Sequence, residues 1–156
     1  MTAILAIDPG TTRSAWVLLE DGLPAAAAIW PNEDVLEGLW RDVEWAVATV
    51  VIEDVEPRQQ PLGRDVADTL RWIGRLMEAA RPLPVHLVTR RAVTAHHVDG
   101  GTKAADSRIR AALIDRYGPG SARRGGPLAG IVKDMWSALA IATYWADTHQ
   151  EEAPQP

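Results

Sequence analysis

Three short apolar runs separated by turn residues fill the first thirty residues, and they restrict the fold more than any other feature. Asp21-Gly22 lies between two of the runs, and this pair favours the tight turn of a β-hairpin. Pro9 and Gly10 break the chain between the first two runs. We therefore expect an antiparallel meander of three strands, at Ala3–Asp8, Ser14–Glu20 and Ala25–Trp30.

After the meander, strand-like and helix-like segments alternate. Thr49–Val55 and Pro84–Thr89 are short and rich in β-branched residues, so each is predicted to be a strand. Apolar residues at helical spacing predict four helices: one from an N-cap at Asn32 through Val47, then Leu62–Met77, Ala104–Tyr117 and Asp134–Asp147. This order gives an α/β fold, a mixed five-stranded sheet with helices on both faces.

Some expectations concern how these segments are buried. The inward face of the second helix is expected to hold Leu62, Val66, Leu70, Ile73, Leu76 and Met77. Residues 90–101 are expected to be irregular, with His96 and His97 at the surface. The tryptophans, including Trp40 and Trp136, are expected to pack in the core or at a dimer interface rather than stack on bases.

The composition is that of an ordinary globular protein. A length of 156 residues with 47% hydrophobic residues predicts one domain, at 1–149, followed by a disordered tail at 150–156. Cysteine is absent, which excludes disulfides and thiolate metal sites. Apolar runs are too short to span a membrane, and Met1 leads into the first strand without a basic segment. A cytoplasmic protein is therefore expected.

Charge is distributed unevenly along the chain, whose net charge is −5. Residues 1–56 carry two basic side chains against 11 acidic ones, whereas residues 86–133 carry nine basic side chains against three acidic ones. Because the local distribution of charge governs phosphate binding, a basic face is compatible with the negative total.

Three carboxylates occupy positions where an unpaired carboxylate is costly. Asp8 ends an apolar strand, Glu53 lies near the end of the most hydrophobic strand, and Asp134 begins an apolar helix. Each alone has an ordinary explanation, as a turn cap, an exposed residue or a helix N-cap. Gathered around one sheet, they would raise one another's pKa values unless a cation neutralised them. Oxygen ligands of this kind suit Mg²⁺ or Mn²⁺.

These residues resemble those of the RuvC family of Holliday-junction resolvases, most closely its small phage-type members. The resemblance extends over nearly the whole chain. The segments that carry it are Ile7-Asp8-Pro9-Gly10, Ser14-Ala15, Val51-Ile52-Glu53, Lys103-Ala104-Ala105-Asp106, Gly126–Gly130 and the helix that starts at Asp134-Met135-Trp136-Ser137.

The resemblance implies an RNase H-like fold and a homodimer that nicks two symmetric strands of a four-way DNA junction, in the cytoplasm of a bacterium or a phage-infected host. It implies that Asp8, Glu53 and Asp134 are catalytic and bind Mg²⁺ or Mn²⁺, with two ions in each site. The family usually has a second aspartate three residues along the last helix, where this chain has Ser137. Ser137, Asp54, Glu56 or a water would then complete the ligand set.

Basic and amide side chains are predicted to bind the DNA. Arg58, Gln59 and Gln60 follow Glu53 in a proline-bounded loop, where RuvC-like enzymes carry a side chain that probes the junction centre. Further basic residues are expected to contact phosphates, and most of them, with Arg90 and Arg91, belong to the basic stretch after the fifth strand. The others are Arg64, Lys103, Arg108, Arg110, Arg123, Arg124 and Lys133.

Three other functions remain open at this point. Ile7–Thr12 is also similar to the first phosphate loop of actin-like ATPases and sugar kinases, which enclose ATP between two such domains. A junction-binding module with a decayed metal site would explain Ser137. A related nuclease would act on forks, flaps or RNA-containing duplexes, because one fold supports many activities.

Overall fold

One mixed sheet organises the structure. The computed structural model describes residues 3–41, 47–100, 103–120 and 125–149. The expected antiparallel meander is formed by β1 (Ala3–Asp8), β2 (Arg13–Glu20) and β3 (Leu23–Pro31). β4 (Thr49–Asp54) pairs in parallel with β1, and β5 (Val85–Thr89) pairs in parallel with β4. The strand order is β3-β2-β1-β4-β5.

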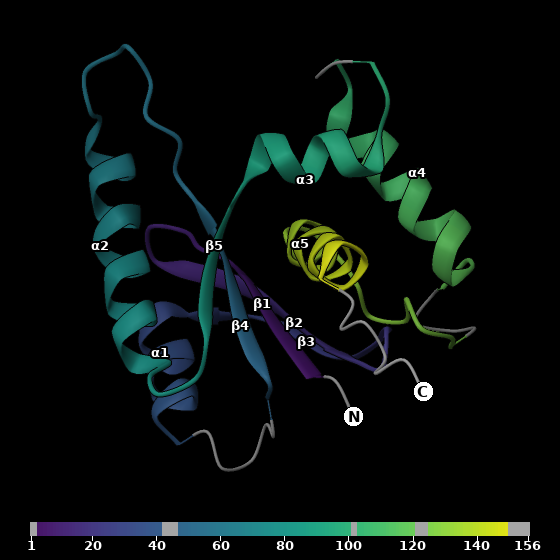
Figure 1. Cartoon of the computed structure of the whole chain (residues 1–156), viewed down its shortest axis with the longest axis horizontal. Coiled ribbons are helices and arrows are strands. Elements are labelled where there is room, and N and C mark those ends of the chain that lie inside the picture. The colour runs from purple at the N-terminus through teal and green to yellow at the C-terminus, as the bar shows by residue number, and fades with distance from the viewer. Residues whose placement is uncertain (1–2, 42–46, 101–102, 121–124, 150–156) are drawn as a thin grey trace, which may run out of the picture.

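Helices cover both faces of this sheet, as expected (Figure 1). In the described residues they are α1 (Asn32–Trp40), α2 (Arg64–Ala79), α3 (Arg90–His97), α4 (Ala105–Tyr117) and α5 (Met135–Thr148). α1 and α2 lie side by side on one face, and α5 crosses the other face. α3 and α4 pack on the outer side of α5.

Side-chain alternation divides the apolar residues of the central strands between two cores. Along β1, Leu5 and Ile7 pack with α1 and α2, whereas Ala6 packs with α5. β4 follows the same rule, because Ile52 joins the first core and Val51 the second. The strands are therefore buried on both faces, which explains why they are apolar nearly throughout.

α5 is buried along its middle, as its almost uniformly apolar sequence predicts. Residues 138–143 are at most 2% exposed and pack against β1 and β2. The one polar residue among them, Thr143, forms a hydrogen bond of 2.9 Å with the Tyr117 hydroxyl of α4. This buried bond fixes α4 on the outer side of α5.

α3 contradicts the expectation that residues 90–101 are irregular. The Thr89 hydroxyl accepts a hydrogen bond from the Ala92 amide and caps the N-terminus of the helix. Val93 and Thr94 are buried against the rest of the second core. Its arginines and alanines favour a helix, but eight residues are too few for a stable isolated helix, so packing against α5 is needed to hold it.

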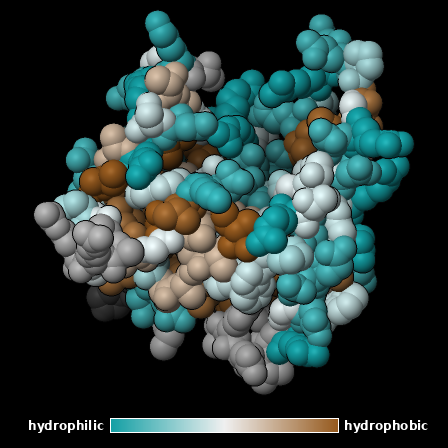
Figure 2. Space-filling view, turned by 180° about the vertical axis from the view of Figure 1, so that it is seen from behind, coloured by the Kyte–Doolittle hydropathy of each residue, from teal (hydrophilic) through white to brown (hydrophobic). Residues whose placement is uncertain are grey.

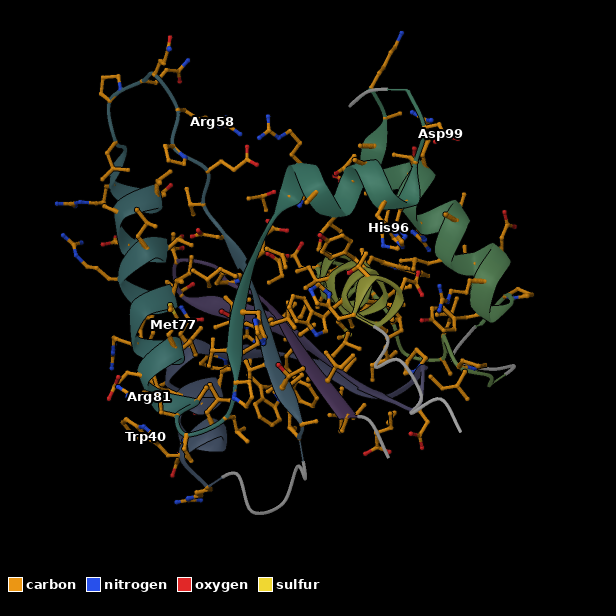
Figure 3. The ribbon with its side chains drawn as sticks, viewed as in Figure 1. Trp40, Arg58, Met77, Arg81, His96 and Asp99 are labelled. Carbon is orange, nitrogen blue, oxygen red and sulfur yellow. The ribbon has the colours of Figure 1, made fainter. Side chains whose placement is uncertain are left out.

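α1 and α2 also differ from the sequence expectations. Leu62, Val66 and Leu70 are 64%, 37% and 37% exposed, so this part of the expected inward face lies outside. Trp40 is 68% exposed and points away from the sheet at the end of α1 (Figure 3). α1 itself ends at Trp40, whereas the expected helix continued to Val47. Val47 is nevertheless buried, in the segment that leads into β4.

The surface combines polar and apolar areas. On the face opposite to that of Figure 1, hydrophobic residues gather in the middle and on the left, whereas the right side is mainly hydrophilic (Figure 2). Among the described residues, no helix is both long and apolar enough to cross a membrane.

Candidate active site

The carboxyl ends of the parallel strands bring Asp8 and Glu53 together. The last pair in the register between β1 and β4 joins Ile7 to Ile52, so the next residues of the two strands are neighbours. Alternation then directs both carboxylates to the face covered by α5, two residues beyond Ala6 and Val51 of the second core. Neighbouring strands therefore carry these two acids side by side.

Asp134 approaches from α5, where it occupies the N-cap position. Lys133, directly before it, has a left-handed backbone with φ of 51° and makes the turn into the helix. Ser137 lies one helical turn later, on the same side of α5 as Asp134. The hydroxyl of Ser137 donates a hydrogen bond to the Asp8 carboxylate.

The electrostatics of Asp8 show that the three acids are close to one another. Burial, together with the negative charges of Glu53 and Asp134, raises the pKa of Asp8 to about 7, against the opposing effects of Arg90 and Ser137. Burial also raises the pKa of Glu53, and Arg90 opposes that increase. The sequence expectation that these residues meet at one place agrees with this arrangement.

A buried hydrogen-bond network holds the turn that follows Asp8. The Ser14 hydroxyl donates to the Asn32 amide oxygen over 2.6 Å, and the Asn32 amide nitrogen donates to the Gly10 carbonyl over 3.0 Å. Gly10 in turn donates its N–H to the Ser14 oxygen over 3.3 Å. Asn32 is fully buried and lies inside α1, so its expected role as N-cap is wrong; Pro31 precedes the helix instead. The sequence alone gave no sign of this network.

Arg90 is the cation of the site in the described structure. It begins α3 directly after β5, and its Nη1 lies 3.8 Å from the Glu53 Oε1. Its Nη2 is 2.5 Å from Oδ1 of Asp106, which belongs to the first turn of α4. Arg90 belongs to the basic stretch expected to contact phosphates, and its pairing with these two acids was not predicted.

The donor set fits a hard divalent cation. Three carboxylates and one hydroxyl offer only oxygen atoms. Burial, and then the charges of Glu53 and Asp134, disfavour the ionised form of Asp8, which a bound cation would favour. In the part of the chain that the structure describes, however, no three His, Asp or Glu side chains are arranged as ligands of a single ion. Arg90 instead supplies part of the compensating charge.

Two alternative ligands have other partners. Asp54 follows Glu53, so alternation directs it away from α5, and it accepts a hydrogen bond from the Val55 amide over 2.8 Å. Glu56 lies 3.6 Å from the Arg91 guanidinium. Ser137 is therefore the one candidate for the additional ligand position whose contact with Asp8 is present in the structure.

A cavity of about 380 Å³ opens beside the acids. Glu53, Asp134 and Ser137 line one part of it, where β4 and α5 meet. Residues of α3 and α4 line the remainder, so the cavity lies where these two helices face α5.

The predicted DNA-binding residues fall into three groups. Arg58, Gln59 and Gln60 are exposed in the loop after β4, and Arg58 points toward the start of α3 (Figure 3). Arg64 and Lys103 are exposed elsewhere on the molecule, and Arg108 binds the Asp99 carbonyl. The remaining candidates are Arg110 and Lys133, which line the cavity, and Arg123 and Arg124, which lie outside the described residues.

Of the two histidines of α3, His96 is exposed, as expected, and His97 is half-buried; both have hydrogen-bonding partners on α5. His96 points toward α5, where its Nε2 lies 2.7 Å from the Asp147 carboxylate (Figure 3). The Asp147 oxygen also accepts a hydrogen bond of 2.7 Å from Arg116 of α4. His97 Nε2 lies 2.8 Å from the Ala140 carbonyl, and burial lowers the pKa of this histidine. These contacts tie α3 and α4 to α5.

Comparison with solved structures identifies the fold. The structure of T. thermophilus RuvC in complex with a Holliday junction substrate matches with a TM-score of 0.65 at 15% identity, over 95% of this chain and 96% of that chain. A Thermus thermophilus RuvC structure matches with a TM-score of 0.60 at 17% identity, over 94% and 96%. No protein-family model and no curated protein matches the sequence. The chain has the RNase H-like fold that RuvC also has.

Proposed function

We propose that this protein is a metal-dependent endonuclease that resolves four-way DNA junctions, and cuts other branched DNA, by hydrolysing phosphodiester bonds. The observation that carries this proposal is the meeting of Asp8, Glu53 and Asp134 where β1 and β4 end against α5. The likeness to RuvC over 95% of the chain supports the same reaction class.

In this proposal the acids hold two Mg²⁺ or Mn²⁺ ions. When bound, such ions polarise the scissile phosphate and lower the pKa of the attacking water. Asp8, Glu53 and Asp134 provide the carboxylate oxygens, and Ser137 orients Asp8 by its hydrogen bond. Gly10, fixed by its bonds to the side chains of Ser14 and Asn32, keeps the end of β1 in place.

The surroundings of the acids suit a branched DNA substrate. The loop that carries Arg58, Gln59 and Gln60 extends from the same end of β4 as Glu53, so these side chains can reach the junction centre. Arg64, Lys103 and Lys133 are exposed and would contact phosphates, which makes binding sensitive to salt. These contacts fix the position of the DNA and carry no sequence preference of their own.

Two symmetric nicks require two active sites, so we propose that the protein acts as a homodimer. Val66 and Leu70 lie one turn apart on the outer side of α2, and Leu62 lies in the loop just before the helix; all three are exposed, and we call them the apolar strip of α2. In the dimer, the apolar strip of one copy would pack against the same strip of the second copy, as a two-fold symmetric interface requires.

The direct test is cleavage of synthetic DNA. A four-way junction, a fork and a linear duplex are each incubated with the purified protein, with Mg²⁺ or with a chelator. Paired nicks at symmetric positions of the junction, only with the metal, identify a resolvase, and cuts in all branched forms identify a broader debranching nuclease. Absence of nicks in every branched DNA would overturn the proposal.

Asp8→Asn separates catalysis from binding. We expect this variant to fold, to bind the junction as tightly as the parent chain and to leave it uncut, because the amide replaces a metal-binding oxygen pair. Asp68→Asn, on the exposed side of α2, is the matched control and should cut normally. Junction binding without cutting by the parent chain would instead indicate a binding module, and stabilisation by ATP alone would indicate a nucleotide-binding domain.

A further inference from the structure

Most of the cavity has no role in the hydrolysis proposed above. Its acidic side, formed by Glu53, Asp134 and Ser137, belongs to the catalytic centre. From there the cavity continues between α3, α4 and α5, and its volume of about 380 Å³ lies in the range of small-molecule sites. A metal ion held by these acids and a phosphate bound to it would occupy only the acidic side, which leaves the part between the helices for another chemical group.

The part between the helices combines an aromatic ring, a guanidinium group and apolar side chains. Arg110 of α4 stacks over the Trp136 ring of α5, with its central carbon 4.8 Å from the ring centre. Val93, Ile109 and Ala140 supply apolar surface from the three helices. Trp136 packs against the core, as expected, but it is only partly buried, so its ring also forms a wall of the cavity.

Hydrogen-bonding groups complete the lining. Thr94 of α3 and Ser107 of α4 bring hydroxyl groups, and Lys133 brings a positive charge next to Asp134. A planar ligand with polar edges, joined to an anionic group, matches this combination. A simple anion would make no use of the tryptophan and the apolar surface, and a purely apolar ligand would make no use of the charges.

We propose that this cavity binds a nucleobase of the cleaved strand, one nucleotide away from the scissile phosphate. The proposal rests on the nuclease function proposed above, because the acids at the cavity entrance fix where the phosphate lies. The base stacks on the Trp136–Arg110 pair, its edge meets Thr94 and Ser107, and Lys133 contacts the adjoining phosphate. The cavity thereby selects the position at which a strand is cut.

The chain offers a matched control for the tryptophan. On α2, Arg75 lies over the Trp72 ring at 4.0 Å, so this pair has the same chemistry as the Trp136–Arg110 pair outside the cavity. Trp136→Leu removes the ring, Trp136→Phe keeps an aromatic face, and Trp72→Leu makes the same change on α2. Thermal unfolding establishes that each variant is folded before binding is measured.

The first measurement does not depend on cleavage. Four-way junctions and short single strands carry the fluorescent base 2-aminopurine at successive positions, and binding is followed in a chelating buffer. We expect quenching at one position by the parent chain and by Trp72→Leu, loss of this quenching in Trp136→Leu, and its return in Trp136→Phe. Junction affinity should fall on the order of tenfold in Trp136→Leu. If free 2-aminopurine nucleotide competes for the cavity as well as the labelled strand does, the cavity binds a free nucleotide and the assignment to a base of the strand is wrong.

The second measurement maps nicks in a library of junction sequences with Mg²⁺. The parent chain and Trp72→Leu should favour one base beside the nick, and Trp136→Leu should lose this preference. If Trp136→Leu keeps the same base preference at the nick, or still quenches the fluorescence, the proposal of a base-binding cavity is wrong. The proposal that the protein is a nuclease is then unaffected. Quenching that depends on Trp136 without any nicks overturns the nuclease and leaves a base-binding cavity.

Discussion

In the folded chain, the side chain of Asp8 stays protonated up to about neutral pH. Its pKa rises to about 7 in the folded state, whereas an unfolded chain ionises it at its ordinary value near 3.8. Between these values the folded state holds a proton that the unfolded state releases. The contribution of Asp8 to the free energy of unfolding therefore decreases as the pH rises from about 4 to 7.

This sign predicts that Asp8→Asn stabilises the metal-free protein in a pH-dependent way. At pH 8 the substitution removes a buried charge and should raise the free energy of unfolding by a few kcal/mol, since each tenfold change in proton affinity is worth about 1.4 kcal/mol. At pH 4 the two proteins should differ little. Denaturant titrations in a chelating buffer measure the difference, and parallel pH profiles would show that Asp8 ionises normally.

Gly10 and Gly74 provide a pair of glycine substitutions with opposite expected signs. A Cβ at Gly10 would lie 2.3 Å from the Arg13 carbonyl oxygen, whereas a Cβ at Gly74 meets no atom within 4 Å. Gly10→Ala should therefore lower stability by about 1–3 kcal/mol and displace the turn after Asp8. Gly74→Ala, inside α2, should raise stability by about 0.5–1 kcal/mol. Thermal unfolding of the two variants compares them, and equal shifts would contradict the geometry of the turn.

At the scale of elements, α3 and α4 meet beside the candidate active site through the ion pair of Arg90 and Asp106. Arg90 compensates the charge of Glu53, and Asp106 draws the same guanidinium away from it. A metal ion held by Glu53 would compete with Arg90 for the carboxylate. In that case Arg90 would lower metal affinity and Asp106 would raise it, because Asp106 pairs with the same guanidinium.

This arrangement predicts opposite effects on Mn²⁺ binding. Arg90→Gln should tighten binding, whereas Asp106→Asn should weaken it, each by a factor of about two to five, because exposed ion pairs are worth about 0.2–1 kcal/mol. Asp68→Asn breaks the comparable Arg71–Asp68 pair on α2 and should have no effect. Calorimetric titration gives the three affinities. Changes of the same sign for Arg90 and Asp106 would mean that the pair serves only to hold α3 against α4.

The elements also show what could be predicted from the sequence. Turn residues and β-branched runs located the strands well, because these signals are local: β4 was expected at Thr49–Val55 and lies at Thr49–Asp54. α3 was missed because its helicity comes from burial of Val93 and Thr94 against distant segments. The outer residues of α2 were misplaced because the apolar pattern does not say which face is covered.

The candidate site divides in the same way. Asp8, Glu53 and Asp134 could be found because a carboxylate at the end of an apolar element is conspicuous in a sequence. Arg90, Asp106 and the Ser14–Asn32 network could not be found, since charged pairs and buried hydrogen bonds form between residues that are far apart in the chain.

At the scale of the whole molecule, the strip on α2 predicts the oligomeric state. If Leu62, Val66 and Leu70 form the dimer interface, Leu70→Glu should convert a dimer at micromolar concentration into a folded monomer. Leu23→Glu, on exposed β3, is the matched control and should remain a dimer. Light scattering after size exclusion gives the masses. A dimer in Leu70→Glu would place the interface on another surface.

The pairing of β1 with β4 has a consequence for the newly made protein. Asp8 and Glu53 become neighbours only when two strands separated by the meander and α1 come together in parallel, a slow, long-range step. If the protein is the nuclease proposed above, it should be unable to cut DNA while it is being synthesised, since Asp8 and Glu53 stay apart until the centre of the sheet has formed.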